Sequence, residues 1–138
     1  MSILAACASL TFAVAGGEGW ISDLNEGLAL GKKEGKPVLA EFTGSDWCPP
    51  CKMMQKQVFS KEEFVKEASE DYILVVVDVP NADPALAKKN EPYFQKYSVS
   101  GVPTVILFDA EGKESTRFGA SRYPSVKKFL KKIQSDKP

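Results

Sequence analysis

Residues 72–79 read Tyr-Ile-Leu-Val-Val-Val-Asp-Val and are apolar, mostly β-branched, at almost every position. A strand with one solvated face alternates apolar and polar residues, whereas a run of this kind is typical of a central strand that is covered on both faces. A second apolar run, Val38–Thr43, follows Pro37 and carries one carboxylate, Glu41. The two runs predict a sheet that is buried on both sides, which limits the chain to layered α/β architectures.

The other elements follow from helical spacing, capping residues and prolines. Apolar residues from Trp20 to Leu30 recur at helical spacing, and we expect a helix there with Ser22 or Asp23 near its start and Gly31 or Gly35 at its end; another helix is expected after residue 48, through Val58. Ser60 and Glu63 have the form of a capping box, at which a second helix, or a bent continuation of the first, is expected to begin. One or two short helices are expected within residues 84–97, a strand at 104–108, a hairpin partner that ends near residue 118, and a closing helix from residue 124. This order predicts an α/β fold with a mixed parallel and antiparallel central sheet and helices on both faces.

Composition narrows the function. The 138 residues, 43% of them hydrophobic, suffice for one domain with its own core. Lys+Arg and Asp+Glu number 18 each, so no basic excess favours nucleic acid as a partner. Histidine, the commonest metal ligand and general base, is absent from the sequence. Three cysteines, two of them in a Cys-x-x-Cys pair, indicate chemistry rather than a disulfide scaffold.

The first fifteen residues differ from the rest. Residues 3–15 are apolar and uncharged and end in Ala-Val-Ala, the pattern of an export signal with its cleavage site. We therefore expect a leader at residues 1–15, a single domain at residues 16–138, and export, with the periplasm as destination. Leu-Ala-Ala-Cys at residues 4–7 also resembles a lipoprotein box, in which Cys7 would carry a lipid anchor. In a third interpretation the segment is structural, Cys7 is a small buried side chain, and the protein is cytoplasmic.

The sequence Trp-Cys-Pro-Pro-Cys-Lys at residues 47–52 holds the cysteine pair. A structural zinc site needs four ligands, and the sequence has neither histidine nor a second cysteine pair. A haem attachment site has histidine where this chain has Lys52. Because the pair follows a predicted strand and opens a predicted helix, the pattern favours a redox-active dithiol.

The same residues carry a family resemblance. Residues 47–52 resemble the active-site motif of thioredoxin, with Pro49 in place of the usual glycine, and Val-Pro-Thr at residues 102–104 resembles the family's cis-proline loop. The resemblance extends over residues 20–134 and, within the family, is closer to exported bacterial members, including the C-terminal domain of a periplasmic electron-carrying reductase. It implies a thioredoxin-like fold, reduction of protein disulfides, electrons from another dithiol protein, and no metal or organic cofactor. We also expect a monomer.

The roles of the two cysteines follow from the helix that they open. A helix N-terminus favours a thiolate, so Cys48, on the outer side of the turn, is expected to attack, and Cys51, one turn inward, to resolve the mixed disulfide. Pro50 fits the first helical turn, where no N–H is needed. Pro49 and Pro50 together remove two donors near the Cys48 sulfur and leave the N–H of Cys51. We therefore expect a thiol pKa in the upper part of the range from about 3.5 to 7, and a strong reductant.

The resemblance adds four residues to the candidate site. Glu41 lies where the family has a buried aspartate that relays protons to the resolving cysteine; the alternative is a structural or exposed carboxylate. Trp47 would pack beside the sulfurs, or be an ordinary core aromatic, or both. Pro103 is expected to be cis and to face the sulfurs, with a trans proline at a strand start as the alternative. The Val102 backbone would then be free to pair with an extended substrate.

The sequence therefore predicts a protein-disulfide reductase that cycles through a Cys48–Cys51 disulfide. Two other functions are compatible with the motif. One is a disulfide oxidase or isomerase, which would have a more oxidising reduction potential. The other is a thioredoxin-fold binding module in which the two cysteines form only a structural disulfide.

Overall fold

The computed structural model describes residues 17–138. The expected leader at residues 1–15 and Cys7 lie outside the described residues. The elements are α1 (Leu24–Glu34), β1 (Val38–Thr43), α2 (Pro49–Met54), the π-helix η1 (Gln55–Phe59), α3 (Glu62–Asp71), β2 (Ile73–Asp78), α4 (Pro84–Lys96), β3 (Thr104–Phe108), β4 (Glu114–Gly119), the 3-10 turn η2 (Ala120–Arg122) and α5 (Val126–Ser135). Within residues 17–138, no helix has the length and apolar character needed to cross a membrane.

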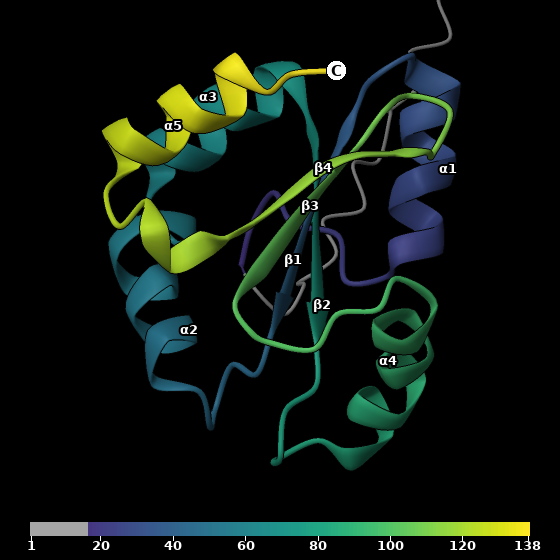
Figure 1. The fold of residues 1–138 in the computed structure, drawn as a ribbon, viewed down its shortest axis with the longest axis vertical. Coiled ribbons are helices and arrows are strands. Elements are labelled where there is room, and N and C mark those ends of the chain that lie inside the picture. The colour runs from purple at the N-terminus through teal and green to yellow at the C-terminus, as the bar shows by residue number, and fades with distance from the viewer. Residues whose placement is uncertain (1–16) are drawn as a thin grey trace, which may run out of the picture.

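The four strands form one sheet in the order β2-β1-β3-β4 (Figure 1). The strands β1 and β2 are parallel, with Glu41 opposite Val76 and Thr43 opposite Asp78. The strand β3 runs antiparallel to β1, and β4 runs antiparallel to β3. The predicted mixed sheet is confirmed, and the two apolar runs form its two parallel strands.

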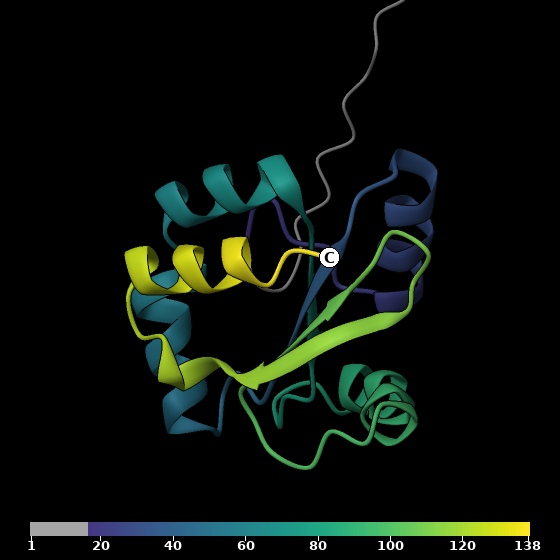
Figure 2. The same cartoon turned by 45° about the horizontal axis from the view of Figure 1, so that its top comes forward.

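Helices cover both faces of the sheet. The helices α2, α3 and α5 lie together on one side, and α1 and α4 lie on the other (Figures 1 and 2). Along β1, Leu39 packs into the first layer, whereas Ala40 and Phe42 pack into the second. Every residue of β1 and β2 is buried, which explains why both sequences lack a polar alternation.

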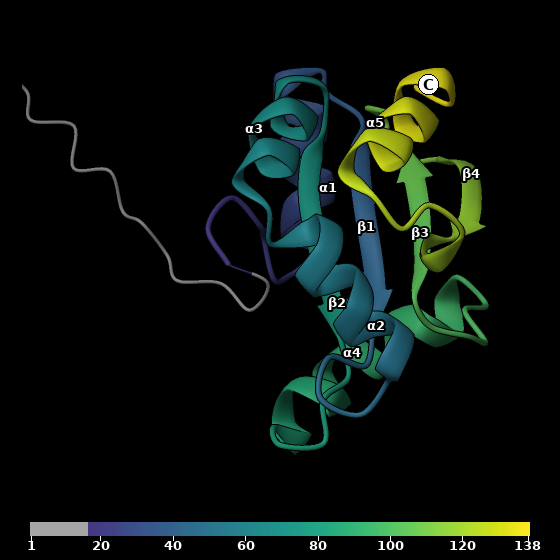
Figure 3. The ribbon, with the colours of Figure 1, turned by 90° about the vertical axis from the view of Figure 1, so that its left-hand side faces the viewer.

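An aromatic cluster fills the space between the sheet and the helices α2, α3 and α5, which stand together in front of the strands in Figure 3. Phe129 of α5 lies edge-on against Phe59 and Phe64, with ring centroids 5.1 and 5.4 Å apart. Trp20 completes the cluster and donates from its indole nitrogen to the Phe59 carbonyl at 3.2 Å. The cluster ties α5 to the helical segment that follows the cysteines.

The first helix begins at one of the two predicted capping residues and ends at one of the two predicted glycines. Trp20 and Ile21 precede α1, whose N-cap is Asp23, with a side chain that accepts from the N–H of Glu26. Ile21 instead forms a parallel bridge to Val75, and two backbone hydrogen bonds of 2.9 Å join its segment to β2. These two residues share the helical spacing of the residues that follow, but they lie before the cap, and their segment pairs with β2 instead.

The helix expected near residue 60 begins at Glu62, but the predicted capping box does not form. The N-cap of α3 is Lys61, which makes no side-chain capping bond. Ser60 closes η1 instead, and its N–H donates to the Gln55 carbonyl at 2.9 Å. The helix that starts at the cysteines therefore continues as a π-helix to Phe59, and only Ser60 separates it from the N-cap of α3.

The segment 84–97 forms a single helix, α4. Its N-cap is Asp83, as its position before Pro84 predicts, and Pro92 lies inside the helix. Asn90, two residues before Pro92, is buried and donates from its side chain to the Asp78 carbonyl at 2.8 Å. Its amide therefore ties α4 to β2, and the helix does not restart there.

Candidate active site

The cysteine pair lies at the connection between β1 and α2. This connection is at the lower left in Figure 1. Cys48 is the N-cap of α2 and Cys51 lies in its first turn; they form a disulfide with Cα atoms 5.2 Å apart. Cys48 is 4% exposed and Cys51 1% exposed. The order agrees with the prediction that Cys48 is the outer sulfur, although only a small part of it reaches solvent.

The Cys51 N–H is the hydrogen-bond donor at the Cys48 sulfur, as the two prolines between the cysteines predict. The N–H of Cys51 points at Cys48 Sγ, with a nitrogen–sulfur distance of 3.3 Å. Pro49 and Pro50 occupy the first two helical positions, where a residue of another type would present an N–H. Since a helix N-terminus stabilises a thiolate mainly through such N–H groups, the two prolines weaken this stabilisation.

A second loop covers the disulfide from the other side. The Val102–Pro103 peptide bond is cis, as predicted. The Val102 carbonyl oxygen lies 3.8 Å from Cys48 Sγ. Pro103 is buried and Val102 is half-buried. The structure thus brings the Cys48 sulfur, on α2, against the residues that lead into β3.

One of the two predictions for Trp47, a core aromatic, is wrong. Its side chain is 45% exposed, so it is not a core aromatic. The indole nitrogen donates to the Val79 carbonyl at 2.8 Å. The ring lies over Gly44, where a Cβ atom would overlap it. The absence of a side chain at Gly44 therefore lets the indole ring lie flat against the chain that leads to Cys48.

The loop between β1 and Cys48 is tied to the end of β2 by carboxylates. Asp78 accepts from Ser45, at 3.0 Å from its N–H and 2.5 Å from its hydroxyl. Asp46 accepts from the N–H groups of Asn81 and Ala82 at 2.8 and 2.7 Å. These two bonds lower the pKa of Asp46, which is solvent-exposed. The loop is therefore held in place from both sides.

Sequence reasoning missed Asp78 and Ser45. Asp78 is 5% exposed, although aspartate is rarely buried without a partner. The signal was present: Asp78 is the single polar residue in the run Ile-Leu-Val-Val-Val-Asp-Val. A carboxylate at the carboxyl end of a buried strand, next to the predicted active-site edge, is a candidate functional residue on its own.

Glu41, in the strand before this loop, is also buried. Its side chain is 2% exposed in the middle of β1, so the exposed-carboxylate alternative is wrong. Burial, together with the nearby charge of Asp78, raises the pKa of Glu41 to about 8. A carboxyl group with this pKa can exchange a proton with a thiol near neutral pH.

Comparison with known proteins decides the assignment. Residues 19–110, well over half of the chain, match the family model described as thioredoxin-like. The chain belongs to the thioredoxin-like family. This confirms the resemblance that the two separated motifs predicted.

Two curated relatives are Dsb proteins. The chain is 39% identical over 97 residues to the disulfide bond reductase DsbH of Chlamydia pneumoniae. The aligned region covers 68% of this chain and 58% of DsbH. It is 30% identical over 107 residues to the thiol:disulfide interchange protein DsbD of Yersinia pestis (strain Pestoides F), which covers 77% of this chain and 17% of DsbD. The chain therefore matches less than two thirds of the length of either relative.

Solved structures agree with the thioredoxin-like fold. A DsbH oxidoreductase superposes with a TM-score of 0.73 at 33% identity, over 85% of this chain and 82% of that chain. The reduced C-terminal domain of Neisseria meningitidis DsbD superposes with a TM-score of 0.63 at 22% identity, over 83% of this chain and 94% of that domain, a likeness of fold. This thioredoxin-like chain is thus similar to Dsb-type thiol–disulfide oxidoreductases, and it has the disulfide-forming pair that their chemistry requires.

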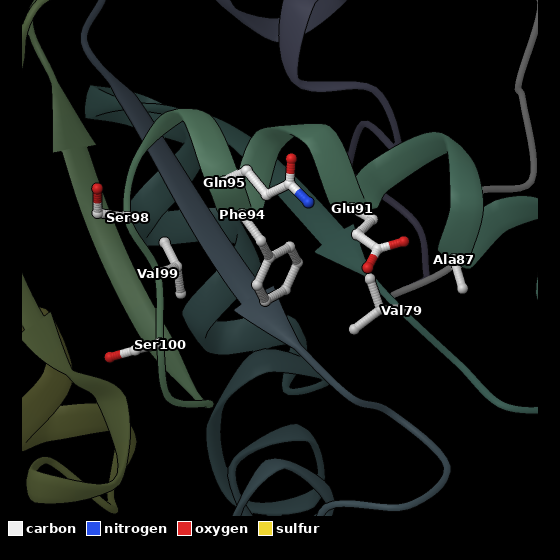
Figure 4. Close-up of a pocket in the computed structure, with 8 residues that line it drawn as sticks. All are labelled: Val79, Ala87, Glu91, Phe94, Gln95, Ser98, Val99 and Ser100. Carbon is white, nitrogen blue, oxygen red and sulfur yellow. The ribbon is translucent and has the colours of Figure 1, made fainter.

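A cavity of about 580 Å³ lies beside the loops of the active site, between α4 and the segment that leads into β3 (Figure 4). Val79, Phe94 and Val99 give it an apolar lining, and Glu91 adds a carboxylate. Its lining includes neither cysteine, but the Val79 carbonyl is the one that binds the Trp47 indole. In residues 17–138, no group of three or more Cys, Asp or Glu side chains is placed to hold a metal ion.

Proposed function

We propose that this chain reduces protein disulfides through a Cys48–Cys51 dithiol–disulfide cycle. The observation that carries the proposal is the disulfide itself, placed at a helix N-terminus with a single N–H at 3.3 Å from the outer sulfur. An attacking sulfur with few donors forms a less stabilised thiolate, and a less stable reduced form is a stronger reductant. The relative DsbH is named a disulfide bond reductase, which supports the same direction.

The cycle uses the two sulfurs in order. In the reduced chain the Cys48 thiolate attacks one sulfur of a substrate disulfide and forms a mixed disulfide, while the other substrate sulfur leaves with the electron pair. Cys51 then loses its proton and attacks Cys48 Sγ, which releases the second substrate sulfur and closes the internal disulfide. Glu41 is the proposed acceptor of the Cys51 proton, because it is buried in β1 next to α2 and its pKa is close to that of a thiol.

Trp47, Val102 and Pro103 are proposed to bind the substrate. Trp47 is the large exposed apolar side chain beside Cys48, and the half-buried Val102 has its carbonyl next to the reactive sulfur. An extended substrate segment can pair with such a backbone by adding a strand-like contact. Both cysteines and this loop come from one chain, so we propose that the protein acts as a monomer.

The partners follow from the chemistry. Two electrons leave the chain in each cycle, so we propose that another dithiol protein reopens the Cys48–Cys51 disulfide. Because disulfides persist in oxidising compartments, we also propose that the chain works outside the cytoplasm, in the periplasm, and that residues 1–15 direct it there.

Insulin reduction tests the function. With dithiothreitol as the electron source, the protein should accelerate insulin precipitation well above the rate with dithiothreitol alone. A variant with both Cys48 and Cys51 replaced by serine is the matched control and should add nothing. An equal rate with and without the unmodified protein would contradict the proposal and favour a binding module with a structural disulfide.

Pro49 is predicted to set the redox poise. Pro49→Gly restores an N–H near the Cys48 sulfur, and Pro49→His adds a positive charge as well. The pKa of the Cys48 thiol should fall in that order, and the reduction potential should rise by roughly 30 mV per pKa unit. Thiolate absorbance against pH and a glutathione equilibrium measure the two quantities. Pro92→Gly, the same change at an exposed position of α4, should leave the pKa and the potential unchanged. Reduction potentials that stay constant or fall in the Pro49 variants would contradict a role of Pro49 in setting the redox poise.

A further inference from the structure

Two buried carboxyl groups lie on the same face of the sheet. Asp78 ends β2 opposite Thr43 of β1, and Glu41 is two residues before Thr43. Because side chains alternate along a strand and registered neighbours share a face, Glu41 and Asp78 point to the same side. That side is the one on which Leu39 and Val76 pack with α2, the helix of the two cysteines. Glu41 and Asp78 are 2% and 5% exposed.

The two carboxyl groups have different surroundings. Ser45 donates its N–H to one oxygen of Asp78 and its hydroxyl to the other, and the charge of Asp78 acts on Glu41. Asn90 holds the backbone of Asp78 through a 2.8 Å bond to its carbonyl. The charge of Asp78 is therefore fixed in position at the end of β2.

No cation compensates this pair among residues 17–138. The ion pairs of the described residues involve neither Glu41 nor Asp78. The neighbouring strand β3 places Val105 opposite Glu41, and α2 contributes the buried Cys51 and Met54. In η1 the first residue is the uncharged Gln55. Lys52, also on α2, is exposed, and its charge acts on Asp46.

Two carboxyl groups in one buried region cannot both ionise without a large electrostatic cost, so one of them holds a proton. Ser45 donates to Asp78, which leaves the proton to Glu41. Burial and the charge of Asp78 both raise the pKa of Glu41.

We propose that Asp78 is a positioning residue for proton transfer, whose fixed charge keeps Glu41 protonated at neutral pH while the Cys48–Cys51 disulfide is closed. The proposal rests on the proposed function and adds the step in which the disulfide is reopened. A donor thiolate forms a bond to Cys48 Sγ, the Cys48–Cys51 bond breaks, and its electron pair leaves on Cys51 Sγ. Glu41 gives its proton to that sulfur and becomes the carboxylate that takes the proton back from Cys51 when the disulfide closes again.

Asp78→Asn tests the proposal, because the asparagine keeps the shape and one acceptor oxygen and removes the charge. In the oxidised protein, carbon-13 NMR of the glutamate side-chain carboxyls, assigned with Glu41→Gln, follows the titration of Glu41. We expect its proton affinity to fall about tenfold or more in Asp78→Asn, which is a midpoint at least about one pH unit lower. Asp46→Asn removes an exposed charge from the adjoining loop and should leave the midpoint of Glu41 unchanged. An unchanged or higher midpoint in Asp78→Asn would overturn the proposal.

A kinetic readout separates positioning from a structural role. The rate at which dithiothreitol opens the disulfide is measured against pH in Asp78→Asn and in the unmodified protein. The ratio of the two rates should dip between the two Glu41 midpoints and return towards one at lower and higher pH. A ratio that is the same at every pH indicates a structural role and contradicts the proposal.

Two further outcomes keep the test decisive. If Asp78→Asn does not fold, the unmodified protein still decides, because a Glu41 side chain that is ionised at pH 7 in the oxidised form contradicts the proposal. The NMR titration needs no turnover. Failure to reduce insulin with a high Glu41 midpoint that depends on Asp78 would reject the proposed function and leave the Asp78–Glu41 coupling intact.

Discussion

Replacing Cys51 by serine is expected to leave the chain covalently attached, through Cys48, to the proteins whose disulfides it attacks. Cys48 keeps its place at the N-cap of α2, and residue 51 keeps the N–H that lies 3.3 Å from the sulfur. Attack therefore proceeds, but residue 51 no longer supplies the thiol that displaces the substrate. Non-reducing electrophoresis with insulin or an oxidised protein with scrambled disulfides should show mixed disulfides that dithiothreitol cleaves.

Cys48→Ser is the matched variant and should behave differently. It removes the attacking sulfur and leaves Cys51, which is 1% exposed and covered by the turn. Insulin reduction should fall to the rate with dithiothreitol alone, and no mixed disulfide should accumulate. Efficient trapping by Cys48→Ser, with none by Cys51→Ser, would reverse the assigned order of the two sulfurs.

Glu41→Gln is expected to make the oxidised protein more stable at pH 8.5 than the unmodified protein. The folded-state pKa of Glu41 is raised from 4.5 to about 8, so its contribution to stability is fully present below about pH 4.5 and is lost as the pH rises to 8. Glutamine is always neutral and loses nothing over this range. The difference in the free energy of unfolding should approach, on the order of magnitude, 5 kcal/mol above pH 8 and vanish near pH 4.

Urea unfolding of both oxidised proteins at pH 4.5, 6.5 and 8.5 measures this difference. Glu63→Gln makes the same change at an exposed position of α3 and should show no comparable trend with pH. In the same protein, Glu41→Gln should slow insulin reduction near neutral pH, because Cys51 loses its proton acceptor. Equal stability of Glu41→Gln and the unmodified protein at pH 8.5 would mean that the carboxylate is accommodated without cost, which contradicts a buried proton-transfer group.

The strands could be predicted almost to the residue, and the reason is physical. β1 and β3 coincide with the short apolar runs that start after Pro37 and at Thr104. Both runs are bounded by residues that cannot continue a buried strand, so the sequence itself marks where each strand begins and ends. The cis geometry at Pro103 was accessible only through the family resemblance, since no local pattern distinguishes a cis from a trans proline.

The helix boundaries were less accessible because tertiary contacts decide them. Ser60 has the composition of an N-cap, but the chain continues from α2 through the π-helix η1, so that its N–H closes that helix. Asn90 has the composition of a cap as well, and its side chain instead reaches the carbonyl of Asp78 on β2. In both cases a contact with another part of the fold outweighs the local preference.

The candidate site shows the same division. The closeness of the two cysteines, and of the Cys51 N–H to the Cys48 sulfur, could be predicted from their spacing, because one helical turn determines this geometry. The contact between Asp78 and Ser45 joins residues 33 positions apart and depends on the register of β1 and β2. A register of this kind cannot be read from the order of residues, so the second carboxylate beside Glu41 emerged only from the fold.

The reduction potential of the Cys48–Cys51 pair tests the central claim most directly. The oxidised and reduced forms can be equilibrated with glutathione or dithiothreitol buffers and quantified after thiol alkylation. A protein-disulfide reductase with two prolines at the start of α2 should have a potential close to that of thioredoxin, about −270 mV. A potential near −120 mV, at the oxidising end of the same series, would contradict the account and assign the chain to disulfide formation.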